Sequence, residues 1–199
     1  MSANPAANKA AIKKQLILKS ARQLFSEKGY SAVTMKDVVE ACGISRGGLY
    51  LYFGSTHDIF VEVMNAEYAD SNDVYISAIM DGTPATKIIG FFLKEKRKQI
   101  LGDTDSLTRA TYEFFFDHPM PADENRLRKD FDESVKILAK LIEKGIEDGD
   151  LYDVDPQAAA RNIMFVLEGL RISALTMDVD QKLVNEQLMY IIDSLLVAS

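Results

Sequence analysis

Residues 34–53 carry side chains whose types and order suit contact with a nucleic acid. Arg46 opens the segment Arg-Gly-Gly-Leu-Tyr-Leu-Tyr-Phe, which also contains Tyr50 and Tyr52. A guanidinium can bond to a guanine edge or a phosphate, and a phenol hydroxyl can donate a hydrogen bond to a phosphate. Because little of this segment is committed to a core, we expect its polar side chains to face outward.

Two short helices joined by a tight turn are needed to position these groups. Thr34 is followed three residues later by Asp37, the spacing of a capping box, which predicts the start of the first helix. Gly43 suits the left-handed residue that ends this helix, and Ser45 suits the N-cap of a second helix beginning at Arg46. A short exposed helix braced by another across a glycine turn fits the DNA major groove.

The expected contacts with DNA follow from these positions. Gly47 and Gly48 are poor helix formers, at about 1 kcal/mol each relative to alanine, a cost that makes sense where the backbone approaches the groove closely. Leu49 and Phe53 lie one turn apart and are expected to point inward. The residues expected from this segment to bind DNA are Thr34, Lys36, Ser45, Arg46, Gly47, Gly48, Tyr50 and Tyr52. Lys13 and Lys14 could add contacts along the phosphate backbone.

Composition and charge bound the class of protein. The chain has 199 residues, of which 47% are hydrophobic, and it lacks long alternating strand patterns, so we expect an all-α fold. Cys42 is the single cysteine, no apolar run is long enough to span a membrane, and the N-terminus lacks a signal-peptide centre, so we expect a cytoplasmic protein.

The net charge of −7 hides an uneven distribution. Residues 1–60 hold eight Lys/Arg side chains against four carboxylates, a net charge of +4, which leaves −11 for the remainder. The basic residues 1–60 could bind phosphates although the rest of the chain is acidic. The alternative is that the uneven charge is simply solvated and has no role in binding. We expect a disordered arm over residues 1–11, a helix-turn-helix DNA-binding domain over 12–55, and a ligand-binding and dimerisation domain over 56–199.

The last two expected helices suggest a contact between subunits. The helix that opens at Asp155-Pro156 is apolar nearly all round, which predicts burial on two sides, and the final helix begins near Gln181. We expect these helices to form half of a homodimeric four-helix bundle, with a large monomeric core as the alternative. The expected dimerisation residues are Val166, Leu170, Ala174, Leu188, Ile192 and Leu195.

Aromatic residues in the body suggest a ligand pocket. Phe114, Phe115 and Phe116 point in directions about 100° apart on a helix, so they cannot all face one core. Glu113 beside them could bind a cationic ligand or a ligand hydroxyl, or it could be a solvated carboxylate paired with Arg109. The residues expected to bind a ligand are Tyr68, Phe91, Phe92, Tyr112, Glu113, Phe115, Phe116 and Phe165.

Over residues 12–60 the chain resembles the TetR family of transcriptional repressors. The resemblance is carried by Leu-Phe-Ser-Glu-Lys-Gly-Tyr at 24–30, the Thr34 cap, Gly-Ile-Ser at 43–45, the segment 46–53 and the Ser55 cap. It implies a nine-helix subunit, a homodimer, a palindromic operator and a small-molecule inducer. Many members have a phosphate-binding lysine where this chain has Thr56, followed by His57. We therefore add Thr56 and His57 to the expected DNA-binding residues, with a weaker or more pH-dependent contact.

The expected function is that of a repressor released from its operator by a small hydrophobic ligand. The ligand would tilt the helix starting near Thr56 and change the spacing of the two recognition helices, which must match about 34–36 Å or a multiple. We expect no enzyme, metal site or cofactor, because the sequence has no nucleophile–base spacing, Gly-rich phosphate loop or His/Cys cluster. The alternatives are a helical protein–protein adaptor without DNA binding and a ligand-independent or activating regulator.

Overall fold

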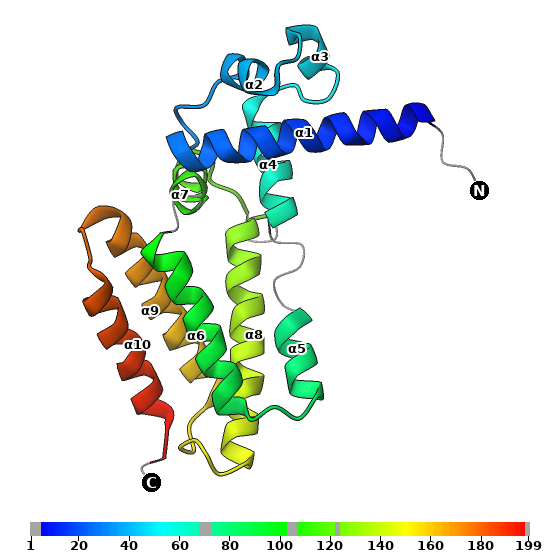
Figure 1. Cartoon of the computed structure of the whole chain (residues 1–199). Helices are drawn as coiled ribbons and strands as arrows, with labels where there is room; N and C mark the ends of the chain where they lie inside the picture. The colour runs from blue at the N-terminus through cyan, green and yellow to red at the C-terminus, as the bar shows by residue number, and fades with distance from the viewer. Residues whose placement is uncertain (1–4, 68–72, 103–106, 122–123, 198–199) are drawn as a thin grey trace. The chain divides into compact units, whose positions relative to one another are not determined.

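The computed structural model describes residues 5–67, 73–102, 107–121 and 124–197, and the regular structure in these ranges is helical, as predicted. One isolated bridge joins Leu151 to Leu196. The helices, shown in Figure 1, are α1 (Pro5–Lys28), α2 (Met35–Cys42), α3 (Arg46–Tyr50), α4 (Thr56–Glu67), α5 (Asp73–Met80), α6 (Ala85–Leu101), α7 (Thr108–Asp117), α8 (Arg126–Glu147), α9 (Pro156–Thr176) and α10 (Gln181–Leu195).

The helix count and the first helix differ from expectation. The single helix expected over residues 56–80 is described as α4 and α5, with residues 68–72 outside the described ranges, so the described chain has ten helices rather than nine. The disordered arm expected over residues 1–11 is wrong from Pro5 onward, because α1 begins there, and residues 1–4 lie outside the described ranges. Four alanines between residues 6 and 11 favour helix over coil there. No helix in the described ranges is long and apolar enough to cross a membrane.

The chain forms two compact units. Unit 1 comprises Met1–Ala69 and Thr104–Met120, and unit 2 comprises Asp70–Asp103 and Pro121–Ser199. This division replaces the expected boundary after residue 55, because α4 and α7 share a core with α1, α2 and α3.

The core of unit 1 is rich in aromatic rings. Phe25 of α1 meets Phe60 of α4 edge-on at 4.8 Å between ring centroids, and Phe114 of α7 lies 5.1 Å from Phe60. All three side chains are fully buried. Helices α1, α4 and α7 therefore form the rigid support on which α2 and α3 rest.

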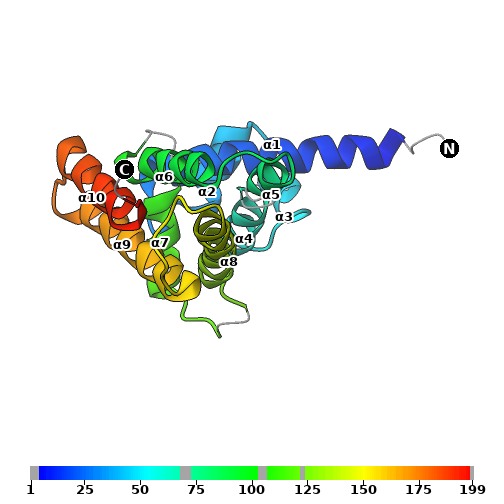
Figure 2. The same cartoon turned by 90° about the horizontal axis from the view of Figure 1, so that it is seen from below.

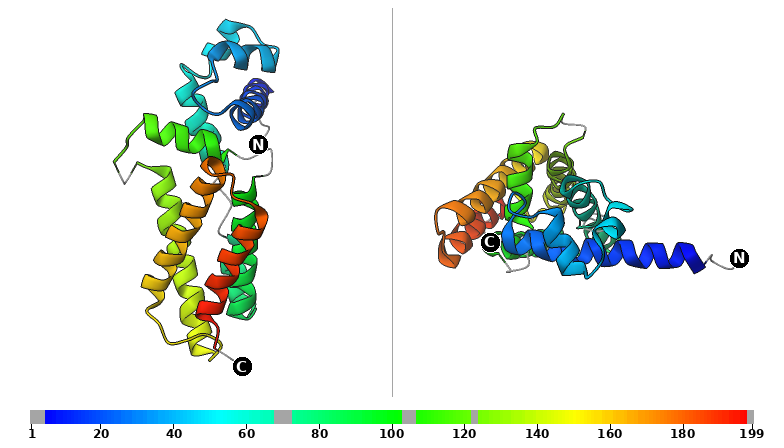
Figure 3. Two further views of the ribbon diagram at one scale, coloured as in Figure 1. Left: turned by 90° about the vertical axis from the view of Figure 1, so that its left-hand side faces the viewer. Right: turned by 90° about the horizontal axis from the view of Figure 1, so that it is seen from above.

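Unit 2 is a bundle in which α8 packs against α6 and α9, and α6 packs against α10 and α5 (Figures 2 and 3). Leu138, Leu141 and Ile142 give α8 a fully buried stripe. Backbone hydrogen bonds from Tyr152 N to Leu195 O and from Val197 N to Asp150 O fasten the end of α10 to the α8–α9 loop. Unit 2 thus has a closed core of its own.

Candidate nucleic-acid interface

The turn between α2 and α3 has the capping geometry that the sequence predicts. The Thr34 side chain accepts a hydrogen bond from Asp37 N, and the Asp37 carboxylate accepts one from Thr34 N at 2.9 Å, completing the capping box. Gly43 takes the left-handed conformation at φ 62°, and Ser45 Oγ accepts a hydrogen bond from Gly48 N at 3.1 Å. Three local signals therefore fix the direction in which α3 leaves the turn.

Helix α3 is anchored on one side and open on the other. Leu49 is fully buried and Phe53, just after the helix, is 4% exposed, as expected. Arg46 is exposed, and its guanidinium carbon lies 5.7 Å from the centre of the Tyr50 ring. A Cβ added to Gly47 would meet no atom within 4 Å. The outer side of α3 thus offers a cation, a phenol and bare backbone.

Helix α1 brings a second cation to the start of α3. The Lys13 ammonium lies 3.8 Å from the position that a Cβ on Gly48 would occupy. Lys13 forms no ion pair among the described residues, whereas Lys14 is paired with Glu62 at 2.9 Å. Of the two lysines, Lys13 is therefore the one available beside Arg46.

Other basic groups of unit 1 are largely neutralised within the protein. Lys28 donates to Asp37 at 2.7 Å, and these hydrogen bonds from Lys28 and Thr34 hold the pKa of Asp37 well below its usual range. Lys36 is 85% exposed and pairs loosely with Glu40 at 3.7 Å. The positive charge that remains uncompensated is therefore concentrated near α3 and along α1.

Leu51 lies on the same exposed surface but was not among the DNA-binding residues expected from the sequence. It follows α3 directly and is 84% exposed, more than any other large hydrophobic side chain among those described. Tyr52, by contrast, is partly buried against the unit 1 core. The helical spacing of Leu49 and Phe53, which predicts the buried side of this segment, also places Leu51 on the opposite side.

Thr56 and His57 have partners within unit 1. The Thr56 hydroxyl is hydrogen-bonded to Tyr30, whose pKa is raised overall, chiefly by burial and by Asp117. The His57 ring lies 5.3 Å from both Phe114 and His118, between centroids. The first turn of α4 thus also contacts α7 and the segment after α1, while the His57 side chain stays 41% exposed and its contact with a phosphate remains a prediction.

The expected ligand-binding residues are not brought together within either unit. Tyr68 lies outside the described residues. Phe91, Phe92 and Phe165 belong to unit 2, where Phe92 is 2% exposed. The others, Tyr112, Glu113, Phe115 and Phe116, lie on α7 in unit 1. The expected ligand-binding residues therefore belong to two units, and their contact with a ligand remains a prediction.

Glu113 has a structural position in unit 1. It accepts hydrogen bonds from Ser31 N at 3.0 Å and from Arg109 Nε at 2.7 Å. Burial alone raises the pKa of Glu113, but these hydrogen bonds outweigh burial and leave it below its usual value. Gly29, at φ 81°, lies so close that an added Cβ would come within 2.5 Å of the carboxylate. Glu113 thus holds the turn after α1, and its pairing with Arg109 is confirmed.

Two of the six expected dimerisation residues are part of the subunit's own core. Leu188 and Leu195 are 6% and 5% exposed without any partner, while Val166, Leu170, Ala174 and Ile192 are partly buried against the same core. Other apolar side chains of these helices are open instead, including Phe165 and Ile172 on α9 and Tyr190 on α10. Leu188 and Leu195 were thus assigned to a contact between subunits, whereas the structure buries them in the core of their own subunit.

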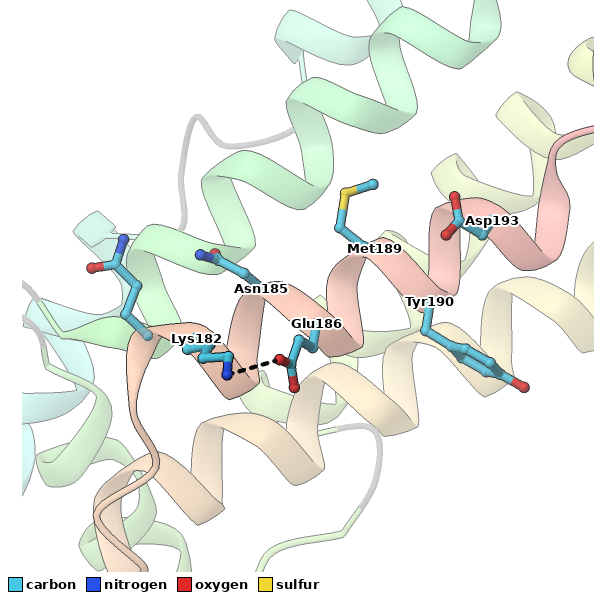
Figure 4. Close-up of a pocket in the computed structure, with 7 residues that line it drawn as sticks. Lys182, Asn185, Glu186, Met189, Tyr190 and Asp193 are labelled. Carbon is cyan, nitrogen blue, oxygen red and sulfur yellow. Dashed lines mark ion pairs between the residues drawn. The ribbon is translucent and has the colours of Figure 1, made fainter.

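A hollow of about 630 Å³ runs along α10 (Figure 4). It is lined by Gln181, Lys182, Asn185, Glu186, Met189, Tyr190 and Asp193, all on this one helix. Lys182 and Glu186 form an ion pair at 3.8 Å across it. A hollow with walls from a single helix does not enclose a small molecule, and it differs from the ligand pocket expected from the sequence.

Comparisons with known proteins agree with this geometry. Residues 17–63 match the family model described as bacterial regulatory proteins, tetR family, and residues 88–185 match a tetracyclin repressor-like C-terminal domain. The uncharacterised HTH-type transcriptional regulator YfiR of Bacillus subtilis is 30% identical over 164 residues, covering 81% of this chain and 80% of that protein. The HTH-type regulator QacR of Staphylococcus aureus is 37% identical over 54 residues, or 27% of this chain and 29% of QacR.

The fold agrees as well. A TetR transcription regulator from Haloarcula marismortui superposes with a TM-score of 0.77 at 18% identity, covering 94% of this chain and 100% of that one. The near-complete coverage includes both units described above. The chain belongs to the TetR family of DNA-binding transcriptional regulators.

Proposed function

We propose that the protein is a repressor that binds a palindromic operator as a homodimer and leaves it when a small molecule binds to unit 2. The observation that carries the DNA-binding part is the capped turn that presents Arg46, Tyr50 and the bare backbone of Gly47 on the open side of α3. These features suit entry of α3 into a major groove.

Three side chains take distinct roles in this proposal. Arg46 bonds to guanine O6 and N7 or to a neighbouring phosphate, and the Lys13 ammonium beside Gly48 contacts the phosphate backbone. Leu51 contacts a thymine methyl, the apolar group that the major groove displays. Thr34 and Ser45, at two helix starts, are close to backbone N–H groups that attract phosphate.

The homodimer is proposed to form through α9 and α10. Phe165, Gly169 and Ile172 follow a spacing of four and three residues, so they share one exposed side of α9. Tyr190, 73% exposed on α10, adds a large aromatic surface. Apolar surface of this kind on paired helices suits a two-fold four-helix contact.

Release from the operator follows from the spacing of the two recognition helices. A ligand that binds better to a dimer with the wrong spacing than to one matching about 34–36 Å shifts the population away from the DNA-bound form. Spin labels on the two copies of α3 should report a change in separation when such a ligand is added. An unchanged separation would contradict this route.

The test is a binding series on DNA fragments selected by the protein from a random-sequence pool. Arg46→Ala should weaken binding about 10- to 100-fold, the cost of one lost bidentate base contact. Lys13→Ala should weaken binding to all sequences and lower the dependence on salt concentration by about one unit of slope. Lys182→Ala, an exposed lysine of unit 2, is the matched control and should leave binding unchanged.

Two results separate this proposal from its alternatives. A helical adaptor would select no DNA sequence at low ionic strength. A ligand-independent regulator would bind DNA with the same dependence on Arg46, but its bound fraction would not respond to any compound that binds unit 2. An activator would raise transcription from a promoter that carries the selected DNA, whereas a repressor would lower it.

A further inference from the structure

Unit 2 contains a cluster of charged side chains contributed by three helices. Lys96 comes from α6, Asp130 and Arg126 from α8, and Glu168 and Arg171 from α9. These helices pack side by side in the bundle (Figure 1). Because charges of this kind are costly to take out of water, their placement needs an explanation.

Most of these charges are paired within the cluster. Arg126 Nη2 lies 3.2 Å from Asp130 Oδ1, and Arg171 Nη1 lies 2.5 Å from Glu168 Oε1, with all four side chains at most 28% exposed. Arg171 also donates to Gln99 Oε1 at 3.3 Å. Each carboxylate is therefore already committed to an arginine.

The Lys96 ammonium and one oxygen of Asp130 are not used by these pairs. The Lys96 ammonium forms no ion pair among the described residues, and it lies over the Phe92 ring at 5.1 Å from the centroid. Asp130 Oδ2 is buried and has no hydrogen-bond partner in the part of the chain described. An unpartnered ammonium and an unpartnered carboxylate oxygen thus lie in the same cluster.

The electrostatics of the cluster agree with this geometry. Burial, followed by the nearby Arg171 guanidinium, lowers the pKa of Lys96 to about 8, with Glu168 and Asp130 offsetting only part of the effect. Burial raises the pKa of Asp130 to about 6, although Arg126, Lys96 and Arg171 oppose the shift. Glu168 and Asp130 do not fully offset the effect of Arg171 and burial on Lys96, so a bound anion would further stabilise the charged form of Lys96.

A purely stabilising role explains the pairs but not the two remaining groups. Buried ion pairs contribute little to stability over an apolar packing of the same volume, and a buried acceptor without a partner weakens the fold. A convergent donor and acceptor are the polar groups that a small-molecule site requires. Phe92, at 2% exposure, lies beneath the Lys96 ammonium as part of the unit 2 core.

We propose that this cluster, centred on Lys96 and Asp130, recognises a small organic carboxylate that also carries a hydroxyl or N–H donor. The ligand carboxylate binds the Lys96 ammonium and approaches Arg171, and the ligand donor bonds to Asp130 Oδ2. This inference rests on the proposed ligand response of unit 2, and it gives a carboxylate to the small hydrophobic ligand expected from the sequence.

The test uses three probes that differ in one group each: sodium 3-hydroxyalkanoates, the matching sodium alkanoates, and the matching 1,3-diols, at short, medium and long chain lengths. Binding to the full-length protein is measured by calorimetry at neutral pH. The hydroxyalkanoate should bind most tightly, the alkanoate more weakly, and the diol weakest. Lys96→Met should weaken hydroxyalkanoate binding about tenfold or more. Lys98→Met, an exposed lysine on the same helix, is the control and should change nothing.

Asp130→Asn separates the two contacts. It should weaken binding of the hydroxyalkanoate several-fold and leave the alkanoate, which has no donor, unaffected. If Lys96→Met fails to fold, labelling of the wild-type protein with an acetylating reagent gives an independent readout by mass spectrometry. The hydroxyalkanoate should protect Lys96 from labelling and leave Lys98 reactive, and the diol should protect neither.

Several outcomes would overturn the inference. These are equal binding of diol and hydroxyalkanoate, an equal loss with Lys98→Met, unchanged labelling of Lys96, or no binding by any carboxylate of the series. In the last case, release of DNA by an uncharged hydrophobic compound would leave the proposed function standing. If no compound of any class changes DNA binding, the proposed function itself fails.

Discussion

Replacing Gly29 by alanine should reveal how strongly Glu113 fastens α7 to the turn after α1. Gly29 adopts φ 81°, and a Cβ at this position would lie 2.5 and 2.6 Å from the two carboxylate oxygens of Glu113. The added methyl must therefore push the carboxylate away from Ser31 N, which it contacts at 3.0 Å. Two costs combine, one from the backbone conformation and one from the displaced carboxylate.

The magnitude follows from these two costs. An L-residue in the left-handed region costs about 1–2 kcal/mol. A hydrogen bond to a charged group contributes about 1.5–3 kcal/mol. Gly29→Ala should therefore lower the free energy of unfolding by roughly 3–5 kcal/mol, out of a total of about 5–15 kcal/mol for a typical protein.

Gly43→Ala is the matched control in the same unit. Gly43 also has a positive φ, 62°, but a Cβ there would meet no atom within 4 Å, so only the backbone cost of about 1–2 kcal/mol applies. At about 2–4 °C per kcal/mol for a chain of this size, Gly29→Ala should melt roughly 5–10 °C below Gly43→Ala. Denaturation in urea and thermal melting would measure both variants.

A double-mutant cycle tests the cause. Glu113→Ala removes the carboxylate that the new methyl displaces, so Gly29→Ala in that background should cost no more than Gly43→Ala. Equal destabilisation by Gly29→Ala and Gly43→Ala in the wild-type background would refute the reasoning. Strict additivity of Gly29→Ala and Glu113→Ala would do so too.

Three further predictions concern acid stability, assembly and base recognition. Because hydrogen bonds from Lys28 and Thr34 depress the pKa of Asp37, its contribution to stability is present above pH ~4 and is lost as the pH falls further, so Asp37→Asn should flatten the acid side of the stability profile in urea titrations. Tyr190→Asp should shift the protein toward monomer in sedimentation, whereas Tyr152→Asp, equally aromatic and 46% exposed, should not; equal effects would exclude α10 from the interface. Replacing thymine by uracil in selected DNA removes one methyl group per base and should weaken wild-type binding about 3- to 5-fold, whereas binding by Leu51→Ala should not change. If uracil weakens binding by Leu51→Ala as much as it weakens wild-type binding, Leu51 does not contact the methyl group.

Local signals made the DNA-binding turn predictable. The Thr34–Asp37 box, the Gly43 bend and the Ser45 cap each depend on atoms within three or four residues of one another, and the structure has all three. The inward side of α3 was predictable for the same reason, since helical spacing alone places Leu49 and Phe53 together.

Long-range pairings were not predictable from the same evidence. The partner of Ser31 N is Glu113, 82 residues away, and nothing near either residue indicates the other. Helical periodicity shows which side of a helix is buried, but it does not show which element covers that side. For this reason Leu188 was assigned to a partner subunit although it lies in the unit 2 core.

The discontinuous make-up of unit 1 has a consequence for exchanging heads between related regulators. The chain leaves unit 1 after residue 69 and returns to it over Thr104–Met120, so a transplanted N-terminal segment would arrive without Phe114 and Glu113. Its Phe25 and Phe60 would then have to pack against a foreign α7. Chimeras joined at a single point should be poorly folded, and a working hybrid should require two inserted pieces from the same donor.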